Sequence, residues 1–194
     1  MKNTYELTVC GVERSLPLIP IDENSAYASF VVIGDTELVE RAAKELAGQI
    51  PPVDVVMTAE AKGIALAYEI SRLLHMKEFI VARKSVKSYM GNPISASLHS
   101  ITTQGEQHIY LDETDIQKVA GKRVCIVDDV ISTGESLRAV EELAQKAGGD
   151  VVCRAAILAE GKAAERTDIL FLGKLPLFER MEDGDYMPVT EDRT

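Results

Sequence analysis

Aromatic residues are scarce in this sequence: it has no tryptophan, and Phe and Tyr make up only 5% of its 194 residues. A hydrophobic core must therefore be built mostly from Val, Ile, Leu and Ala. Apolar residues amount to 46% and charged residues to 27%, as in an ordinary globular protein. The length predicts one domain, or one domain with a small appendage, that buries roughly 70% of the unfolded chain's surface.

Cysteine and histidine are also rare. The cysteines are Cys10, Cys125 and Cys153, and the histidines are His75, His99 and His108. The cysteines form no CxxC pair, and two of them lie in apolar runs, where a thiol behaves as a small buried apolar group. The histidines have no metal-ligand spacing with cysteines or acids. The sequence therefore predicts a reduced protein without a metal centre built from Cys or His.

Long apolar runs and an excess of basic residues are missing as well. No run approaches the ~18 apolar residues of a membrane span, and the N-terminus does not have the apolar stretch of a secretory signal. The 21 basic and 31 acidic residues give a formal net charge of −10, which disfavours nucleic-acid binding. The one notable basic cluster is at residues 83–87. We therefore expect a cytoplasmic protein that binds neither a membrane nor nucleic acid.

The chain does contain a regular alternation of strand-like and helix-like segments. Strands are predicted at residues 4–10, 28–33, 53–57, 79–82, 150–158 and 169–172, and from residue 124 up to two adjacent acids. Helices are predicted at residues 37–49 and 63–74, in a short turn at 115–119, and in a segment that ends near residue 145. Residues 14–24 are proline-rich and extended, and residues 95–101 and 108–111 are suited to a hairpin.

This alternation predicts an α/β fold in which helices cover a parallel sheet. Ligands of such sheets bind beyond the carboxyl ends of the strands. The polar turns at residues 58–63, 83–87 and 128–136 each follow a predicted strand. We therefore expect these three turns to converge on one edge of the sheet.

Residues 124–137 (VCIVDDVISTGESL) combine a buried strand, two acids, a hydroxyl-rich turn and the start of a helix. Free N–H groups at a helix start, together with the helix dipole, bind phosphate. Gly134 allows close approach of the backbone, and Ser132, Thr133 and Ser136 supply hydroxyl donors. Asp128 and Asp129 are suited to accept hydrogen bonds from sugar hydroxyls. The stretch predicts a site for a phosphorylated, polyhydroxylated ligand.

This stretch resembles the phosphoribosyl-pyrophosphate (PRPP) signature of the type I phosphoribosyltransferases, and the resemblance covers about residues 35–175. Glu60-Ala61-Lys62-Gly63 looks like the pyrophosphate loop of that family. The run Arg83-Lys84-Ser85-Val86-Lys87 resembles the Arg-Lys-x-x-Lys segment of adenine phosphoribosyltransferases, which contacts pyrophosphate and opens a mobile loop. Residues 88–107 stand where that family has its catalytic flap.

The resemblance implies specific roles in binding PRPP with Mg²⁺. The PRPP-binding residues would be Asp128, Asp129, Ser132, Thr133, Gly134, Glu135 and Ser136, with Glu135 pointing outward. The pyrophosphate-binding residues would be Ala61, Lys62, Arg83, Lys84 and Lys87, and the catalytic residues Asp128, Asp129 and Lys87. Mg²⁺ would bind through PRPP, with the two aspartates as its candidate protein ligands.

The resemblance also implies the parallel-sheet type I phosphoribosyltransferase fold, with flanking helices, a flexible flap loop and a small hood over the base. We expect a single domain over residues 1–194. Its hood would come from about residues 1–34 and 159–182, its core from about 35–158, and a frayed polar tail from 183–194. Because the family usually builds its site near a subunit interface, we also expect a homodimer.

The sequence leaves the base open. Ser132 stands where hypoxanthine-guanine enzymes commonly have an aspartate, which favours the adenine and xanthine enzymes. The candidate base-binding residues are Leu18, Asn24 and Glu160. Glu160 would accept from the exocyclic amine of adenine, whereas Lys162 would donate to an oxo group.

The expected activity is therefore that of a purine-salvage enzyme that converts adenine and PRPP to AMP and pyrophosphate. The alternatives are a xanthine or hypoxanthine phosphoribosyltransferase, or a PRPP-sensing purine regulator without catalysis. Such a regulator would need a DNA-binding module with a basic face, which does not fit the acidic composition of this chain.

Overall fold

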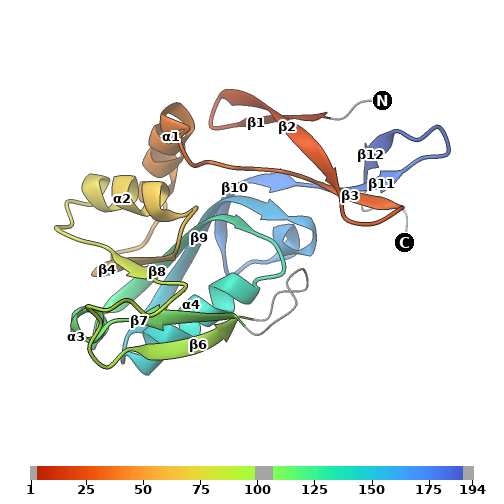
Figure 1. The fold of residues 1–194 in the computed structure, drawn as a ribbon. Helices are drawn as coiled ribbons and strands as arrows, with labels where there is room; N and C mark the ends of the chain where they lie inside the picture. The colour runs from red at the N-terminus through yellow and green to blue at the C-terminus, as the bar shows by residue number, and fades with distance from the viewer. Residues whose placement is uncertain (1–3, 99–106, 190–194) are drawn as a thin grey trace.

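The computed structural model describes residues 4–98 and 107–189, and Figure 1 shows a parallel sheet covered by helices, with a second sheet beside it. The strands of the main sheet lie in the order β10-β9-β8-β4-β5, and all neighbouring pairs are parallel. Their bounds are β4 Val55–Ala59, β5 Ile80–Ala82, β8 Arg123–Ile131, β9 Asp150–Glu160 and β10 Leu170–Leu175. The prediction of an α/β fold with a parallel sheet is confirmed.

The helices form two layers, one on each face of this sheet. Helices α1 (Thr36–Ala47) and α2 (Ile64–Leu73) pack on one face, and α4 (Glu135–Lys146) packs on the other. Each helix buries an apolar stripe, as Leu38, Ala42 and Leu46 do in α1. A short helix, α3 (Glu113–Val119), precedes β8, and the 3₁₀ helix η1 (Gly161–Glu165) follows β9. No helix in the described ranges has the length and apolar character that crossing a membrane requires.

The second sheet, here called the hood, is antiparallel and joins both ends of the chain. Its strands lie in the order β1-β2-β3-β11-β12, with bounds Thr4–Val9, Val12–Pro20, Ser25–Ala28, Leu177–Arg180 and Tyr186–Pro188. The hood meets the main sheet where Val9 approaches Gly173 of β10, so closely that a Cβ on this glycine would lie 3.3 Å from a methyl group of Val9. Hood, α1, α2 and one face of the main sheet thus share a single core.

Two predicted elements were wrong. Residues 28–33 keep the predicted alternation, with Phe30 and Val32 buried and Val31 and Ile33 exposed. Beyond Ala28, however, only the Ser29 N–H still bonds to β2, at the carbonyl of Pro17, and residues 29–33 form a linker. The segment expected to be a frayed tail instead contains β12, which pairs with β11 at the edge of the hood. Its half-buried Tyr186 packs against the shared core, which offsets the polar character of its neighbours.

A hairpin follows β5, as predicted. Its strands, β6 (Ile94–Leu98) and β7 (Gln107–Leu111), pair antiparallel, and β6 packs on α4, where the Lys146 ammonium donates to the carbonyl of Ser95 at 2.8 Å. Residues 99–106, at the tip of this hairpin, lie outside the described residues. The flexible flap over residues 88–107 therefore stays a prediction.

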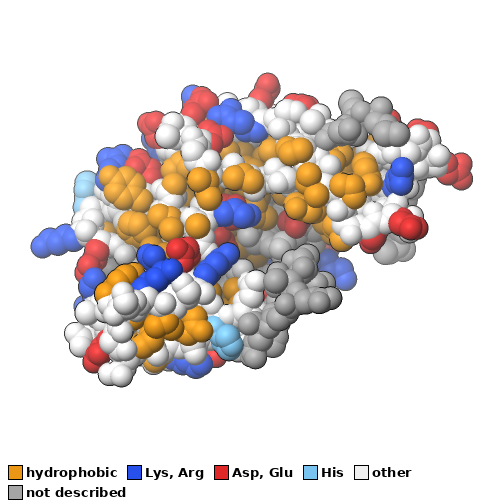
Figure 2. Space-filling view, in the orientation of Figure 1, with side chains coloured by type: hydrophobic (Ala, Val, Ile, Leu, Met, Phe, Trp, Pro, Cys, Tyr) orange, Lys and Arg blue, Asp and Glu red, His pale blue; other side chains and the backbone are white. Residues whose placement is uncertain are grey.

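An apolar groove of about 730 Å³ runs between α1 and α2. The residues that line it include Ile33, Val39, Ala61, Ile64, Tyr68 and Phe79. Figure 2 shows that apolar side chains gather in a band across this face, over α1, α2 and the hood. Tyr68 is 57% exposed and Ile33 56%.

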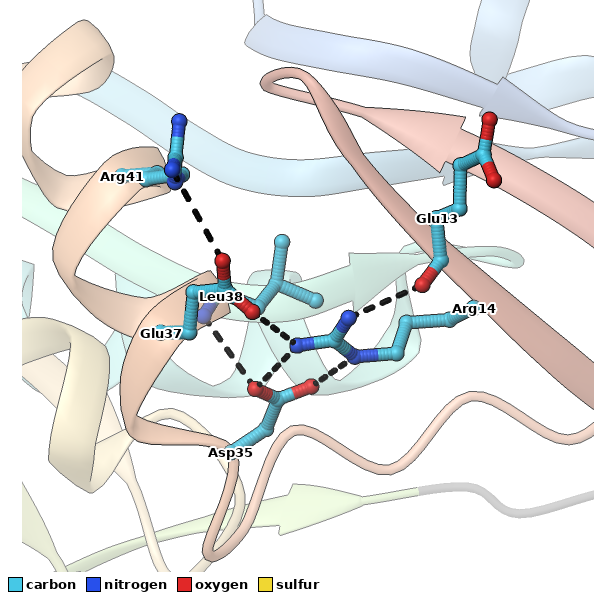
Figure 3. A network of polar contacts seen from close by, with 6 residues as sticks. All are labelled: Glu13, Arg14, Asp35, Glu37, Leu38 and Arg41. Atoms are coloured by element: carbon cyan, nitrogen blue, oxygen red, sulfur yellow. Dashed lines mark hydrogen bonds and ion pairs between the residues drawn. The ribbon is translucent and has the colours of Figure 1, made fainter.

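One guanidinium ties the hood to α1 (Figure 3). Arg14 of β2 donates from Nε and Nη2 to the two carboxylate oxygens of Asp35 at 2.7 and 2.9 Å, and from Nη2 to Glu37 at 3.0 Å. Asp35 is also the N-cap of α1, because it accepts from the Leu38 N–H at 3.2 Å. The same carboxylate thus begins the helix and anchors the hood.

Candidate active site at the carboxyl edge of the sheet

The three polar turns do converge beyond the carboxyl ends of β4, β5 and β8. In the turn after β4, Lys62 places its ammonium 3.4 Å from Oδ2 of Asp129 in β8. Glu60 of the same turn lies 3.6 Å from Nε of Arg83, which follows β5. A continuous series of charged side chains therefore links the three turns, as the parallel sheet predicts.

The two aspartates lie within β8 rather than after it, because the strand continues to Ile131. Successive residues of a strand point to opposite faces, so the two carboxylates have different surroundings. Asp129 is only 3% exposed, and its Oδ2 accepts no hydrogen bond from the described residues. Burial, followed by repulsion from Asp129, raises the pKa of Asp128, whose Oδ1 accepts from the Asp129 N–H at 2.8 Å.

Gly63 allows the turn after β4 to touch β8. A Cβ at this position would stand 2.2 Å from Oγ1 of the buried Thr58 and 3.2 Å from the carbonyl oxygen of Val127. Any larger residue would push the start of α2 away from β8. This close approach places Lys62 opposite Asp129.

The turn after β5 carries three cations that surround one carboxylate. The Lys84 N–H donates to Oε2 of Glu60 at 3.0 Å, and this bond, followed by the charges of Arg83 and Lys87, lowers the pKa of Glu60. The Lys87 ammonium donates to Ser85 Oγ at 2.7 Å. These contacts assemble a cationic surface next to Lys62, suited to an anion.

The loop between β8 and α4 has the geometry expected of a phosphate loop. Gly134 has φ +81°, a left-handed conformation that favours glycine, and α4 begins at the next residue. Ser132 and Thr133 are exposed, and Ser136 lies in the first turn of α4. The carboxylate of Glu135 lies 3.4 Å from Arg138, one turn further along the helix.

The structure brings only one of the three candidate base-binding residues to this edge. Glu160 ends β9, where burial raises its pKa and the nearby charge of Lys62 opposes that shift. Leu18 is buried in the shared core. Asn24 is exposed in a turn, where its N–H donates to Asp22 and its carbonyl accepts from the Arg180 N–H, both at 2.8 Å. The described contacts of Asn24 are therefore those of a turn residue.

At this edge, one residue was not predicted and another, Glu60, was placed in the pyrophosphate loop without a role of its own. Glu60 balances the cationic turn, and Arg166, which follows η1, reaches over Gly134. No spacing in the sequence marks Arg166, because the fold alone brings the end of η1 to the loop before α4. The pyrophosphate-loop pattern included Glu60, but only the fold shows that the Lys84 N–H donates to its carboxylate.

Comparison with known proteins identifies the family. The model of the phosphoribosyl transferase domain matches residues 32–172, which include all three turns. The chain belongs to this family. It is a type I phosphoribosyltransferase of the purine branch, with the parallel sheet and antiparallel hood described above.

Relatives of this phosphoribosyltransferase differ in the base that they are named for. It is 32% identical to a hypoxanthine/guanine phosphoribosyltransferase of Methanothermobacter thermautotrophicus over 71% of this chain and 70% of the relative. It is 35% identical to an adenine phosphoribosyltransferase of Petrotoga mobilis over 51% of this chain and 54% of that one. These identities assign the enzyme to the purine type without selecting one base.

The fold also matches solved structures of the family. An adenine phosphoribosyltransferase of Thermoanaerobacter pseudethanolicus superposes with a TM-score of 0.67, over 82% of this chain and 95% of that chain, at 21% sequence identity. At this identity the match establishes the shared fold.

The acid pair of this phosphoribosyltransferase fits Mg²⁺, the metal expected to accompany PRPP. Carboxylate oxygens are the ligands that Mg²⁺ prefers, and Asp129 offers a buried oxygen that accepts no hydrogen bond from the described residues. Among the residues described, no three acidic, His or Cys side chains converge into a full coordination set. Mg²⁺ in proteins is commonly held by one or two carboxylates together with water and substrate phosphates, an arrangement that the acid pair would suit.

Proposed function

We propose that this phosphoribosyltransferase transfers ribose 5-phosphate from PRPP to adenine, producing AMP and pyrophosphate for purine salvage. The observation that carries the proposal is the contact of Lys62 with Asp129, because it joins a sugar-binding acid to the cationic turn at one edge. A phosphorylated sugar with a pyrophosphate leaving group needs both kinds of group side by side.

Each turn has a role in this proposal. Residues 132–136 bind the 5′-phosphate through the start of α4, and Asp128 and Asp129 bind the ribose hydroxyls. The turn at Ala61 and Lys62 binds the pyrophosphate together with the cations of residues 83–87. Mg²⁺, when bound with PRPP, neutralises part of the charge on the pyrophosphate oxygens.

The reaction replaces one bond at the anomeric carbon by another. A ring nitrogen of the base attacks that carbon as its bond to the pyrophosphate oxygen breaks, through an oxocarbenium-like transition state. Lys62 and Lys87 stabilise the charge that develops on the departing oxygen. The protein contributes mainly positioning, leaving-group stabilisation and exclusion of water.

Adenine is favoured by the residues that face the base. Ser132 offers no carboxylate for a protonated purine nitrogen, and the segment from Arg83 to Lys87 has the Arg-Lys-x-x-Lys spacing of adenine enzymes. Glu160 accepts hydrogen bonds, as the exocyclic amine of adenine requires. Lys162, which would suit an oxo group instead, is exposed in η1.

A panel of four bases tests the proposal. Purified protein is mixed with Mg²⁺, PRPP and adenine, hypoxanthine, guanine or xanthine in turn, and pyrophosphate release is measured. We expect turnover to be fastest with adenine, with AMP as the product.

The other outcomes are equally informative. Preference for xanthine or hypoxanthine would overturn the assignment of adenine. It would favour Lys162, rather than Glu160, as the residue that contacts the base. Release of pyrophosphate with none of the four bases would contradict catalysis and support a PRPP-sensing regulator.

We also propose that the protein is a homodimer in which a second copy covers the groove between α1 and α2. Proteins that stay monomeric rarely expose a large contiguous apolar surface, and the exposed Tyr68 and Ile33 lie in this groove. Ala61 lines the groove and also belongs to the proposed pyrophosphate-binding turn. The interface would thus adjoin the active site.

A further inference from the structure

Arg166 covers the loop that precedes α4. Its Nη1 atom lies 3.0 Å from the position that a Cβ on Gly134 would occupy. Gly134 therefore serves two needs, since its φ of +81° favours glycine and its missing side chain leaves room for this guanidinium. The side chain of Arg166 is 34% exposed, so a ligand can reach it.

An ion pair fixes the orientation of this guanidinium. Nε and Nη2 of Arg166 donate to the two carboxylate oxygens of Asp168 at 2.9 and 2.7 Å. Such a bidentate pair holds the planar group in one orientation. Nη1 makes no hydrogen bond to any of the described residues, and it is the nitrogen nearest Gly134.

The acidic side chains nearby are already paired with other cations. Glu141 of α4 binds Arg154 of β9, and Glu135 lies 3.4 Å from Arg138. After the hydrogen bonds to Asp168, the charge of Glu141 also contributes to the raised pKa of Arg166, but no hydrogen bond joins the two side chains. Nη1 therefore faces the start of α4, where N–H groups without helical acceptors and the helix dipole create a positive potential. Two positive groups side by side are unfavourable unless an anion lies between them.

We propose that Arg166 is a further residue that binds the 5′-phosphate, by donating from Nη1 to the anion held at residues 132–136. Asp168 acts as a positioning residue, because it fixes the guanidinium without touching the ligand. The inference rests on the proposed function, in which this loop binds the 5′-phosphate of PRPP.

Binding of two simple anions tests the inference without any base or turnover. Titration calorimetry measures ribose 5-phosphate, which needs the loop, and pyrophosphate, which needs the turns at Lys62 and Arg83. Removing a hydrogen bond from a charged donor at a partly exposed site lowers the affinity for the ligand by roughly tenfold. We expect Arg166→Gln to weaken the binding of ribose 5-phosphate by this amount and to leave the affinity for pyrophosphate unchanged.

Arg123→Gln is the matched control. Arg123 forms the same bidentate pair with Asp54, at 3.0 and 2.9 Å, but it begins β8 and so lies at the opposite end of the sheet. The two variants lose the same charge, so a general electrostatic effect would weaken ribose 5-phosphate equally in both. Asp168→Asn keeps the charge of Arg166 but removes its bidentate ion pair. We expect this variant to bind ribose 5-phosphate with an affinity between those of wild type and Arg166→Gln.

Equal affinity for ribose 5-phosphate in wild type and in Arg166→Gln would overturn the inference, as would equal weakening in the two glutamine variants. Arg166→Lys, compared at matched melting temperature, decides the case if the glutamine variant unfolds: it should bind more weakly than wild type. If none of the four bases releases pyrophosphate but ribose 5-phosphate still binds, the proposed reaction is refuted. The role of Arg166 is then decided by the affinities of wild type and Arg166→Gln for ribose 5-phosphate.

Discussion

Asp129 combines a buried side chain with a carboxylate group that lies in the candidate active site. Its carboxylate is almost fully buried, yet Oδ2 has only the Lys62 ammonium, at 3.4 Å, as a described neighbour of opposite charge. A buried carboxylate with so few partners costs stability. That cost is understandable if the oxygen is reserved for the ribose hydroxyls or for the water shell of Mg²⁺.

Replacing Asp129 by asparagine should separate activity from stability. The side chain keeps its size and loses no hydrogen bond at Oδ2, so the melting temperature should stay near that of wild type. Turnover with PRPP should fall by roughly a hundredfold or more, because a preorganised charge at the reacting sugar is lost. Steady-state kinetics and thermal unfolding measure the two effects.

Asp54→Asn is the control, because Asp54 is an exposed partner of Arg123 at the other end of the sheet. Its turnover should match that of wild type. An Asp129→Asn enzyme with full activity, or one that is merely unfolded, would contradict the role assigned to Asp129.

Individual site residues could be predicted where their spacing reflects the chemistry of a single turn. The acids of β8 and the hydroxyls before α4 lie together in the sequence, so the strand-to-helix pattern was sufficient to place them. Arg166 could not be predicted, because its contact with Gly134 depends on how η1 folds back. Asn24 looked suitable by chemistry, but its described contacts are those of a turn residue.

Among the elements, α1 is unusual in sharing its N-cap with a strand of another sheet. The Arg14 guanidinium lowers the pKa of Asp35, with a further contribution from the Leu38 N–H. A carboxyl group with a lowered pKa in the folded state stabilises the protein above its unfolded pKa, about 4, and that stabilisation is lost as pH falls through the folded-state pKa. Attachment of the hood should therefore weaken in acid.

Urea unfolding of Asp35→Asn at about pH 7 and about pH 3 measures this effect. Asparagine still caps the helix but has no charge, so we expect the variant to be less stable than wild type at neutral pH. The difference should shrink as the pH falls and wild-type Asp35 becomes protonated.

Asp35→Ala is the companion variant, because it also removes the acceptor for the Leu38 N–H. It should lose about 1 kcal/mol more than the asparagine variant at both pH values, which is the typical contribution of an N-cap. If the stability difference between wild type and Asp35→Asn is the same at both pH values, the ion pair with Arg14 does not contribute as described.

Helices and central strands were predictable because their patterns are local. The apolar spacing of α1, α2 and α4 and the β-branched runs of β4, β8 and β9 are independent of distant partners. Edge elements were harder, since a strand exists only where a neighbour pairs with it. Residues 30–33 have a strand-like pattern but belong to no sheet among the described strands, whereas β12 has a polar sequence and a partner in β11.

On the scale of the whole molecule, the parallel sheet separates two cores. One core joins the hood to α1 and α2, and the other lies between the sheet, α4 and the hairpin β6–β7. The carboxyl edge of the sheet lies where both cores end. The groove between α1 and α2 is lined in part by Ala61, in the turn after β4.

Sedimentation velocity at micromolar concentration tests the proposed dimer. We expect the wild type to sediment as a dimer and Tyr68→Glu to dissociate to monomers, because the new carboxylate would be buried without a partner at the interface. Tyr27→Glu is the control, since Tyr27 is an exposed tyrosine of the hood outside the groove. A monomeric wild type, or equal dissociation of both variants, would count against this interface.

The pairing of β3 with β11 joins Ser25 to Glu179, so the hood depends on two segments that lie far apart in the sequence. During synthesis, β1, β2 and β3 leave the ribosome well before β11, the strand that covers the free edge of β3. An uncovered edge is a template for pairing with other chains. Premature termination before β11 would therefore leave an aggregation-prone edge on β3, although β1, β2 and β3 had all been translated correctly.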